Sequence, residues 1–322
     1  MSQSAIMNQS TTVSQLDIIL VSYNTAEYTK RAIESVYAET HDTDFKIIMV
    51  DNDSKDGSEE LIAKEFPKVE IIQTGANLGF AGGVNIGAKA SDSEYVLLLN
   101  PDTVILDGAI DKLMSYAIKR PKAGIWGGVT LNNNLSLNPN NARARLSFKT
   151  LLFSALGLSK AFNNSCYFNH DNYGCWDRKT EREVDVITGC FFLTPRTLWE
   201  ELEGLDETFF MYAEEADYCI RAITKGYQPC VTPDARIIHH GGVSETNLSG
   251  KMLKLLKGKA ELINKHAKNW EKPIHKGLLQ LHVLNKLIAL KLVSLIKKDK
   301  QITLTEWQKV YDQRKEWLRG YK

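Results

Sequence analysis

The 322-residue sequence predicts an α/β fold built around an open sheet, and three apolar runs in its first hundred residues are the basis of this prediction. Each run is short enough for one buried strand and ends directly in polar side chains. The three junctions are Ile18–Val21 with Ser22–Asn24, Ile47–Val50 with Asp51–Asp53, and Val96–Leu99 with Asn100–Asp102. Ligands of open α/β sheets bind outside the carboxyl ends of the strands. The sequence therefore predicts one polar site at that edge.

Turn chemistry is the alternative explanation, because Asp and Asn also follow strands when they form turns or cap helices. The segment Asp53–Ser58, for example, has the composition of a turn leading into a helix at Glu59–Glu65. Asp102 favours a functional site, because it follows Tyr95–Leu99, a run apolar enough for burial on both faces. Its carboxylate would emerge where a hydrated divalent cation and a diphosphate could be held.

The next element is a glycine-rich stretch, Gly75–Gly87, which follows the predicted strand Val69–Thr74 where a helix should begin. Glycines there let backbone N–H groups approach a phosphate or a sugar, although each could equally serve close packing of helix on sheet. A dinucleotide-binding fold would need a G-x-G-x-x-G motif after the first strand. The residues Ser22–Asn24 contain no glycine, which argues against a nicotinamide enzyme.

A strand pattern at Val184–Leu193 is followed by the acidic segment Phe209–Arg221, where Glu214, Glu215 and Asp217 crowd one predicted helix start. Asp217 lies four residues before Arg221, so the two can pair along the helix in a structural role. Glu214 and Glu215 lack such a partner. Crowding raises the pKa of a carboxyl group, which suits a general base for a hydroxyl. The alternative is a solvated acidic first turn.

The chain divides into three parts by composition. Residues 1–15 are rich in Ser, Gln and Thr, and we expect a flexible tail without a signal peptide. Residues 16–249 alternate strand and helix patterns and contain the candidate site. Residues 250–322 form a Lys-rich helical segment, with thirteen lysines and three acidic residues up to position 300.

The Lys-rich segment contains the apolar stretch Leu278–Ile296, which Lys286 and Lys291 interrupt. Its uninterrupted apolar length is below the roughly 20 residues of a membrane-spanning helix, so we expect none. Two interpretations stay open: a basic amphipathic helix on an anionic membrane surface, or a helix packed on the main domain or on a second copy of the chain. The segment lacks the interleaved aromatic residues that stack on bases, which argues against nucleic acid.

The overall composition, 25% charged and 43% hydrophobic, is typical of a soluble globular protein. The five cysteines show no C-x-x-C spacing, which fits a reducing cytoplasm better than a disulfide scaffold. Cys166 and Cys175 bracket His170, but two Cys and one His without close spacing are more typical of ordinary loop residues than of a zinc site.

Seven motifs in this order resemble the family 2 glycosyltransferases, and most closely their bacterial rhamnosyltransferase-type branch. The motifs are Val21–Asn24, Val50–Ser58, Asn77–Asn85, Asn100–Asp102, Gly189–Phe192, Phe209–Arg221 and His239–Ser244. The resemblance implies a GT-A fold, which is a mixed sheet flanked by helices. It also implies a nucleotide-diphospho-sugar donor, a divalent metal and inversion at the anomeric carbon.

The resemblance also assigns expected roles in donor binding. The nucleoside pocket would be lined by Ser22, Tyr23, Asp51 and Asp53, with Asp51 accepting the imide N–H of the pyrimidine, while Asn77, Gly79 and Asn85 would border the donor. Asp102 matches the last acid of the family's Asp-x-Asp motif and would bind Mg²⁺ or Mn²⁺. Asn100 stands in place of the first acid. His239 matches a histidine that completes the metal site in related enzymes, the alternative being a structural histidine.

The catalytic and acceptor residues follow from the same comparison. Glu215 stands at the position of the base, where the family usually has Glu-Asp and this chain has Glu214-Glu215, so either carboxylate remains a candidate. The acceptor would contact Trp126, Arg143, Arg145 and Tyr212, which offer sugar-stacking and phosphate-pairing groups.

The expected function is therefore an inverting, metal-dependent transfer of a rhamnose-like sugar from a dTDP- or UDP-sugar. The acceptor would be a hydroxyl of a glycan or lipid-linked glycan in bacterial cell-surface polysaccharide synthesis, on the cytoplasmic face of the membrane. A nucleotidyltransferase would show a glycine-rich basic loop after the first strand, which Ser22–Tyr28 lacks. An inactive sugar-nucleotide-binding module would be expected to lack Asp102 or Glu215, and both are present.

Overall fold

A computed structural model describes residues 15–242 and 247–321, so most of the predicted tail and the end of the His239–Ser244 motif lie outside the described residues. The strands are β1 Leu16–Ser22, β2 Phe45–Asp51, β3 Glu70–Gln73, β4 Tyr95–Leu99, β5 Thr103–Leu106, β6 Trp126–Leu131, β7 Leu137–Asn138, β8 Ala142–Arg143, β9 Arg182–Glu183, β10 Val186–Ile187, β11 Phe191–Pro195 and β12 Cys230–His239. The α-helices are α1 Ala26–Glu39, α2 Ser58–Glu65, α3 Gly79–Ala90, α4 Ala109–Lys119, α5 Phe148–Ala155, α6 Leu158–Ala161, α7 Arg196–Glu201, α8 Glu214–Thr224, α9 Leu248–His266, α10 Glu271–Ile296, α11 Gln301–Asp312 and α12 Arg314–Trp317. Short 3₁₀ helices cover Pro121–Ala123, Pro139–Asn141 and Lys298–Lys300.

The central sheet is mixed and has the strand order β3-β2-β1-β4-β11-β6-β12-β5. Strands β1 to β4 run parallel, whereas β11 is antiparallel to both β4 and β6. The register pairs Ser22 with Asp51, so the carboxyl ends of β1 and β2 finish level. The predicted α/β fold with a mixed sheet flanked by helices is confirmed, and the predicted strand ends lie along one edge.

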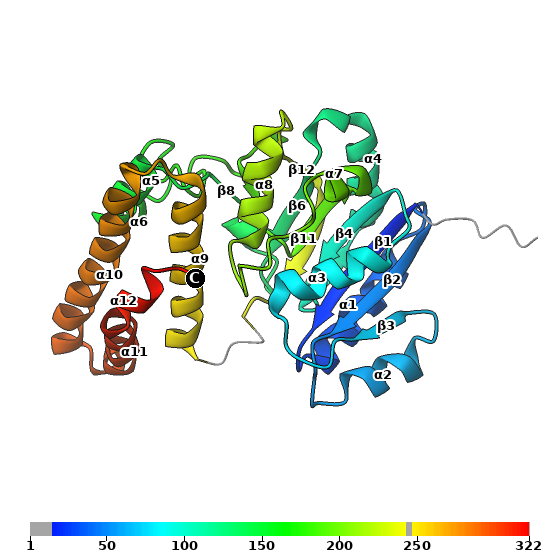
Figure 1. The fold of residues 1–322 in the computed structure, drawn as a ribbon, viewed down its shortest axis with the longest axis horizontal. Helices are drawn as coiled ribbons and strands as arrows, with labels where there is room; N and C mark the ends of the chain where they lie inside the picture. The colour runs from blue at the N-terminus through cyan, green and yellow to red at the C-terminus, as the bar shows by residue number, and fades with distance from the viewer. Residues whose placement is uncertain (1–14, 243–246, 322) are drawn as a thin grey trace, which may run out of the picture.

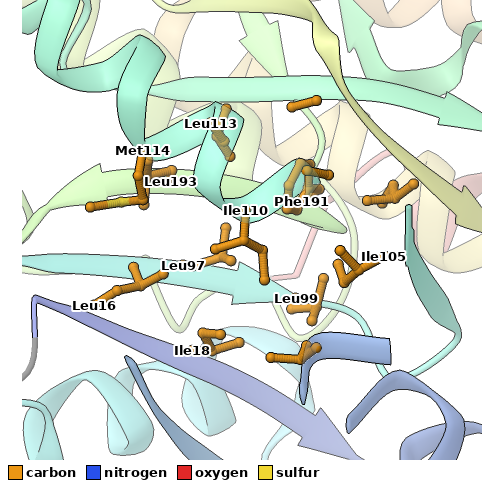
Figure 2. Packing of buried hydrophobic residues seen from close by; sticks show 14 of the residues in the cluster. Leu16, Ile18, Leu97, Leu99, Ile105, Ile110, Leu113, Met114, Phe191 and Leu193 are labelled. Atoms are coloured by element: carbon orange, nitrogen blue, oxygen red, sulfur yellow. The ribbon is translucent and has the colours of Figure 1, made fainter. Parts of the chain in front are cut away.

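Helices cover both faces of this sheet because each strand is apolar on both sides. One core layer packs α1 and α4 against β1, β4 and β11, and Figure 2 shows Leu16, Leu97 and Ile110 within it. The opposite layer packs α3, α7 and α8 against the alternate side chains of the same strands. Each fully buried aliphatic side chain contributes roughly 1.5–3 kcal/mol, so these two layers fix the strand ends in place.

The C-terminal helices form a separate layer beside the sheet, as Figure 1 shows for α9, α10 and α11. A third core cluster holds this layer together and includes Leu256, Leu279 and Trp317. Leu151 of α5 belongs to the same cluster, so the helical layer also takes in a segment that precedes residue 249. The Lys-rich segment therefore packs as part of the fold, and α9 faces the sheet domain.

Helix α10 is longer and more apolar than the sequence analysis allowed. In the described residues its 26 residues reach the length and hydropathy of a membrane-spanning helix, contrary to the expectation drawn from Lys286 and Lys291. Helices packed inside soluble proteins can meet the same test, and α10 packs against α5, α9 and α11. Only 22% of its most apolar window is buried, however, so much of its apolar surface is uncovered.

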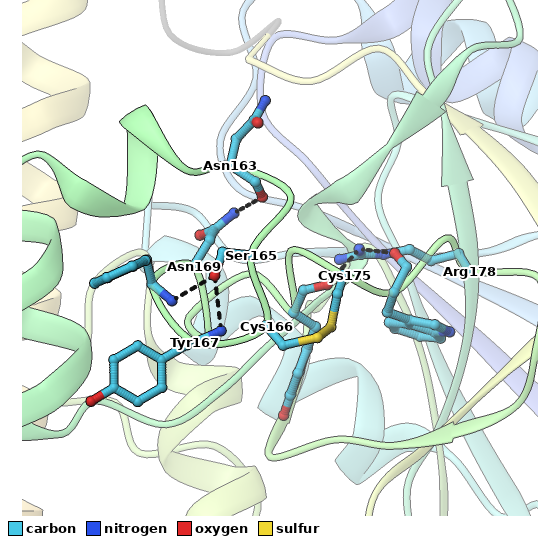
Figure 3. Close-up of a disulfide and its surroundings, with 10 residues drawn as sticks. Asn163, Ser165, Cys166, Tyr167, Asn169, Cys175 and Arg178 are labelled. Carbon is cyan, nitrogen blue, oxygen red and sulfur yellow. Dashed lines mark hydrogen bonds between the residues drawn. A yellow bond between two sulfur atoms is a disulfide. The ribbon is translucent and has the colours of Figure 1, made fainter.

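One cysteine pair is bridged. A disulfide joins Cys166 to Cys175 in the irregular region between α6 and β9, with the two Cα atoms 4.9 Å apart (Figure 3). The expectation of reduced cysteines is wrong for this pair, because the loop folds back and brings the two sulfurs together. The bridge also excludes the zinc alternative with His170. The other three cysteines are buried thiols.

Candidate active site

A cavity of about 500 Å³ opens at the carboxyl edge of the sheet. Three parts of the chain line it. Strand ends supply Asn100 and Asp102, the first turn of α8 supplies Glu214 and Glu215, and the helical layer supplies Lys259. The cavity therefore lies between the sheet domain and the C-terminal helices, and both layers contribute polar side chains to it.

Asp102 and His239 meet at one end of this cavity. The Asp102 carboxylate accepts the backbone N–H of Gly241 at 2.9 Å, and its other oxygen lies 3.3 Å from His239 Nε2. Asn100 Nδ2 lies 3.4 Å from the same imidazole nitrogen. The neighbouring His240 packs its ring edge on Tyr28 instead. Of the two histidines in the His239–Ser244 motif, His239 is therefore the one that lines the cavity.

Burial raises the pKa of Asp102, but hydrogen bonds from His239 and Gly241 outweigh burial and hold the pKa below its ordinary value. The group is consequently a carboxylate at neutral pH. A carboxylate oxygen and an imidazole nitrogen that face each other suit a divalent cation, which would displace the proton that His239 Nε2 donates to Asp102. In the described residues no cluster of three or more His, Cys, Asp or Glu forms a complete metal cage, so a bound ion would need further ligands from a substrate or water.

Asn52 is a further polar residue of the cavity, which it lines together with Tyr23, Asn77 and Gly79. Asn52 Nδ2 donates to the carbonyl of Gly79 at 2.8 Å. Its Oδ1 is buried and accepts no hydrogen bond within the described part of the chain. Since a buried unpaired oxygen is costly, this atom is suited to accept a hydrogen bond from a ligand.

The two residues that precede Glu214 and Glu215 at the start of α8 have a strained backbone. Tyr212 and Ala213 both have positive φ angles, 70° and 83°, directly before Glu214. Such conformations are unfavourable for residues with a side chain and cluster at functional sites. This turn directs Glu214 and Glu215 into the cavity, where Glu214 Oε2 is buried and accepts no hydrogen bond in the described residues.

Burial raises the pKa of both glutamates. The charge of Glu215 raises the pKa of Glu214 further, whereas Arg143 opposes the rise at Glu215. A carboxyl group with a raised pKa is a stronger base once ionised, which fits it to accept a proton from a hydroxyl.

Two glycines hold the loop Phe209–Ala213, the 209–213 loop, from opposite sides. Gly79 has φ +74°, and a Cβ at that position would lie 2.0 Å from the carbonyl oxygen of Phe210. A Cβ on Gly258 of α9 would lie 2.4 Å from the carbonyl oxygen of Tyr212. The sheet domain and the helical layer therefore both pack against the loop that presents the acids.

Asp217 is the second connection between the layers. This fully buried carboxylate pairs with Arg221 at 2.7 Å, Lys265 at 2.7 Å and His266 at 2.8 Å. Burial raises the pKa of Asp217, but hydrogen bonds from His266, Lys265 and Arg221 and the charge of Arg221 outweigh burial and hold the pKa far below its ordinary value. The expected structural pair of Asp217 and Arg221 is present, and α9 adds Lys265 and His266 as further partners of Asp217.

The predicted site residues divide into two groups. Those that line the cavity are Tyr23, Asn77, Gly79, Asn100, Asp102, Arg143, Arg145, Tyr212, Glu214, Glu215 and His239. Those that do not are Ser22, Asp51, Asp53, Asn85 and Trp126.

The second group has identifiable contacts elsewhere. Ser22 hydrogen-bonds Thr25, and Asn85 donates to the Leu205 carbonyl. Trp126 is 1% exposed and donates to a main-chain carbonyl, which leaves it no surface for an acceptor. It is therefore misplaced among the acceptor residues.

Asp51 and Asp53 lie at the end of β2, outside the cavity lining. Asp51 is 2% exposed and accepts the N–H of Ser54 at 2.8 Å. Asp53 pairs with Lys55 at 2.6 Å.

Sequence reasoning missed the contribution of α9. Its residues Lys251, Lys254 and Lys259 line the cavity, whereas the sequence analysis left a membrane surface, the main domain and a second copy open as contacts of the Lys-rich segment and named none of these lysines as a site residue. Lys254 and Lys259 are five residues apart, about 140° around a helix, so no helical-face pattern in the sequence marks these lysines as a group. Thr188 and Phe210 are further lining residues without an assigned role.

Comparison with known proteins identifies the family to which the chain belongs. The model of glycosyl transferase family 2 matches residues 17–199, more than half of the chain. The chain belongs to this family.

Two bacterial relatives refine the class to the rhamnosyltransferase-like branch. The chain is 26% identical to the N-acetylglucosaminyl-diphospho-decaprenol L-rhamnosyltransferase of Mycobacterium tuberculosis over 70% of this chain and 76% of that protein. It is also 26% identical to rhamnosyltransferase WbbL of Escherichia coli K12, over 69% and 82%. Among solved structures, a mannosyltransferase from Pyrobaculum calidifontis in complex with GDP-Man and Mn²⁺ has a similar fold, with TM-score 0.56 and 14% identity over 97% of this chain and 86% of that one.

Proposed function

We propose that this protein transfers a rhamnose-like sugar, with inversion, from a dTDP- or UDP-sugar to a hydroxyl of a lipid-linked glycan. The names of both bacterial relatives support the sugar, and the name of the Mycobacterium tuberculosis protein also supports a lipid-linked acceptor. The observation that carries the proposal is that Asp102 and Glu215 line the same cavity. One acid is suited to the donor diphosphate and the other to the acceptor hydroxyl.

The donor half of the site would be the carboxyl edge of the sheet. Tyr23 would border the nucleoside. For Asp51 to accept the imide N–H of the pyrimidine its carboxylate would have to become exposed, since it is 2% exposed and lies outside the cavity lining. Asn52 Oδ1, which is buried and without a hydrogen bond in the described residues, supplies an acceptor for a donor hydroxyl. This arrangement distinguishes uracil and thymine poorly, because both present the same imide edge.

Asp102 and His239 would hold Mg²⁺ or Mn²⁺ together with oxygens of the donor diphosphate. Such an ion offsets negative charge on the departing nucleoside diphosphate. Asn100 lies within reach of the same imidazole and restrains its orientation. The role of these residues is to keep the leaving group fixed at one end of the cavity.

Glu215 would take the proton of the acceptor hydroxyl as that oxygen attacks the anomeric carbon. The new carbon–oxygen bond forms as the bond to the diphosphate oxygen breaks, so a single displacement inverts the configuration. Glu214 stands beside it, and burial together with the charge of Glu215 raises the pKa of Glu214.

Membrane association is also part of this proposal. The end of α10 and the start of α11 expose large apolar side chains, namely Ile288 47%, Leu292 62%, Leu295 81%, Ile296 86% and Ile302 79%. Lys291, Lys297 and Lys298 lie along the same stretch. Apolar side chains beside lysines fit an anionic bilayer surface, which would place the enzyme on the cytoplasmic face beside its acceptor. A contact between two copies of the chain is the competing explanation.

The test uses purified protein with Mn²⁺, a panel of dTDP- and UDP-sugars and a glycosyl-diphosphate lipid acceptor. We expect nucleoside diphosphate release and an inverted linkage by NMR. Asp102→Asn should abolish transfer and Mn²⁺-dependent binding of the nucleoside diphosphate, because the diphosphate loses its cationic clamp.

Asp107→Asn is the matched control, since Asp107 follows the neighbouring strand β5 but pairs with Arg236 at the surface. Calorimetry that shows unchanged Mn²⁺-dependent binding in Asp102→Asn would remove Asp102 from the site.

A further inference from the structure

A second pocket opens off the active-site cavity on the side of the helical layer. It measures about 130 Å³ and lies between α5, α9, α10 and α11. Five residues line both spaces: Arg143, Leu146, Asp171, Leu255 and Lys259. The two spaces therefore share one wall, which we call the junction, and a ligand could extend from the cavity into the pocket.

The junction carries two cations from different layers, Arg143 of β8 and Lys259 of α9. Neither side chain forms an ion pair with a carboxylate among the described residues, and the guanidinium of Arg143 donates to the amide oxygen of Asn140 at 3.2 Å. Asp171 is the acid at the junction, so the positive charge exceeds the negative charge there. An anion would complete this arrangement.

The lowered pKa of Lys259 agrees with a position that is shielded from water. Burial lowers its pKa, Asp171 opposes that shift, and Arg143 adds to it. Two cations that repel each other in a partly buried space are costly unless an anion lies between them. Arg143 also acts on Glu215, which connects the junction to the base.

Beyond the junction the walls are mainly apolar; the polar lining residues there are Thr150, Ser154 and His282, of which Ser154 and His282 hydrogen-bond each other. Leu151, Leu256 and Leu279 are buried side chains of the third core cluster, and Met252 and Trp307 pack against it. A cationic entrance followed by an apolar interior matches a ligand with a phosphate head and a hydrocarbon chain. The pocket is small, so it suits the first part of such a chain.

We propose that Arg143 and Lys259 bind the diphosphate of a polyprenyl-linked acceptor and that the second pocket holds the beginning of its chain. This inference rests on the proposed function, which supplies the lipid-linked acceptor. It separates two diphosphates in space, with the donor's at Asp102 and the acceptor's at the junction. The acceptor sugar would then be directed toward Glu215.

The experiment measures binding first, so that it does not depend on transfer. Farnesyl diphosphate, inorganic pyrophosphate and farnesol are titrated into the full chain without donor, by calorimetry and by the fluorescence of Trp307 read against Trp307→Phe. We expect farnesyl diphosphate to bind at least about tenfold more tightly than either of the other two, because only it satisfies both parts of the site.

Variants then separate the head from the chain. Lys259→Met and Arg143→Gln should each weaken farnesyl diphosphate binding by about tenfold or more, and Met252→Trp should reduce its advantage over pyrophosphate. Binding of the nucleoside diphosphate with Mn²⁺ should stay unchanged. Lys257→Met is the matched control, since Lys257 lies on the same helix and pairs with Glu316 outside both spaces.

Several outcomes would overturn the inference. Equal binding of farnesyl diphosphate and pyrophosphate would show that the pocket takes no chain. Equal losses in Lys257→Met and Lys259→Met, with unchanged circular dichroism, would show a general charge effect. A loss of nucleoside diphosphate binding in Lys259→Met would place Lys259 in the donor site. Tight farnesyl diphosphate binding without any sugar transfer would contradict the proposed function and leave this subsite standing.

Discussion

The two walls of the active-site cavity differ in how they supply functional side chains. On the sheet side, Asn100 and Asp102 come directly after a strand, and β4 fixes their position through hydrogen bonds along its length. On the helical side, Lys259 comes from the middle of α9, and its position depends on how a whole helix docks. The sheet wall is therefore a product of local sequence, and the helical wall a product of tertiary packing.

This difference explains which parts of the site were predictable. Asp102 was identified because a buried strand and its polar end lie within eight residues of one another in the sequence. Lys259 was not, because nothing local distinguishes it from Lys257, which pairs with Glu316. Docking of α9 against the 209–213 loop assigns one lysine to the cavity and the other to the surface.

Two predicted site residues have structural contacts and do not line the cavity. Asn85 lies in the Asn77–Asn85 motif, yet its amide donates to Leu205 and its oxygen accepts the N–H of Leu205. Trp126 lies inside β6, where its size fills the core. The Cys166–Cys175 bridge also escaped prediction, because the path of an irregular loop is set by contacts that no periodic pattern reports.

The largest expected effect concerns the acids on α8. Glu215→Gln keeps the size of the side chain but removes the basic oxygen, so the rate of transfer should fall by about a hundredfold to ten-thousandfold with nearly unchanged donor affinity. Glu214→Gln should reduce the rate less. Transfer assays with saturating acceptor would check both.

Because the pKa of Glu215 is raised, the rate should also decline as pH falls through a value above the ordinary glutamate pKa of 4.5, where the base becomes protonated. If Glu214→Gln is inactive and Glu215→Gln is active, Glu214 is the base and Glu215 is not. Two active variants would mean that neither acid is the base.

The next effect tests whether both walls support the 209–213 loop. Gly79→Ala should be the more damaging glycine change, because it combines a positive φ with a contact to a carbonyl oxygen at 2.0 Å. Gly258→Ala should destabilise the protein by about 1–3 kcal/mol through overpacking. Denaturant unfolding and kcat measure the two consequences.

Gly277→Ala provides the control within α10, where a Cβ would meet nothing within 4 Å. This change should be neutral or stabilise the helix by roughly 0.5–1 kcal/mol. A Gly258→Ala variant as stable as Gly277→Ala would show that α9 does not press on the loop.

Asp217 provides a test of the contact between the layers. Asp217→Asn leaves Lys265 and His266 without their buried partner and should cost on the order of 3–5 kcal/mol. The exposed pair of Asp107 with Arg236 is the comparison, and Asp107→Asn should cost about 0–1 kcal/mol. Urea unfolding would measure both changes.

The lowered pKa of Asp217 also gives a pH dependence. Its contribution to the free energy of unfolding is complete above the ordinary aspartate pKa of 3.8 and is lost as pH falls further toward the folded-state pKa. The wild type should therefore lose stability more steeply below that pH than Asp217→Asn does. Parallel acid titrations of the two proteins would contradict this assignment.

The smallest expected effect concerns the outer surface of the helical layer. We expect the full chain to bind vesicles that contain anionic lipid and to dissociate as salt rises, because Lys291, Lys297 and Lys298 contribute through screened charges. Replacing the exposed Leu295 and Ile296 by Ser should weaken this binding by a few-fold without changing stability. Sedimentation velocity run alongside distinguishes the alternative, since a loss of dimers without a loss of vesicle binding would assign the surface to a second copy.

The close packing of Gly258 against the backbone of Tyr212 affects how the protein unfolds. Because the 209–213 loop lies against α9 and the Asp217 carboxylate pairs with Arg221 of α8 and Lys265 of α9, neither layer can open without exposing groups of the other. The two layers should then behave as one cooperative unit in a calorimeter, with a van't Hoff enthalpy close to the measured enthalpy. The active site would be assembled in the same event that completes folding.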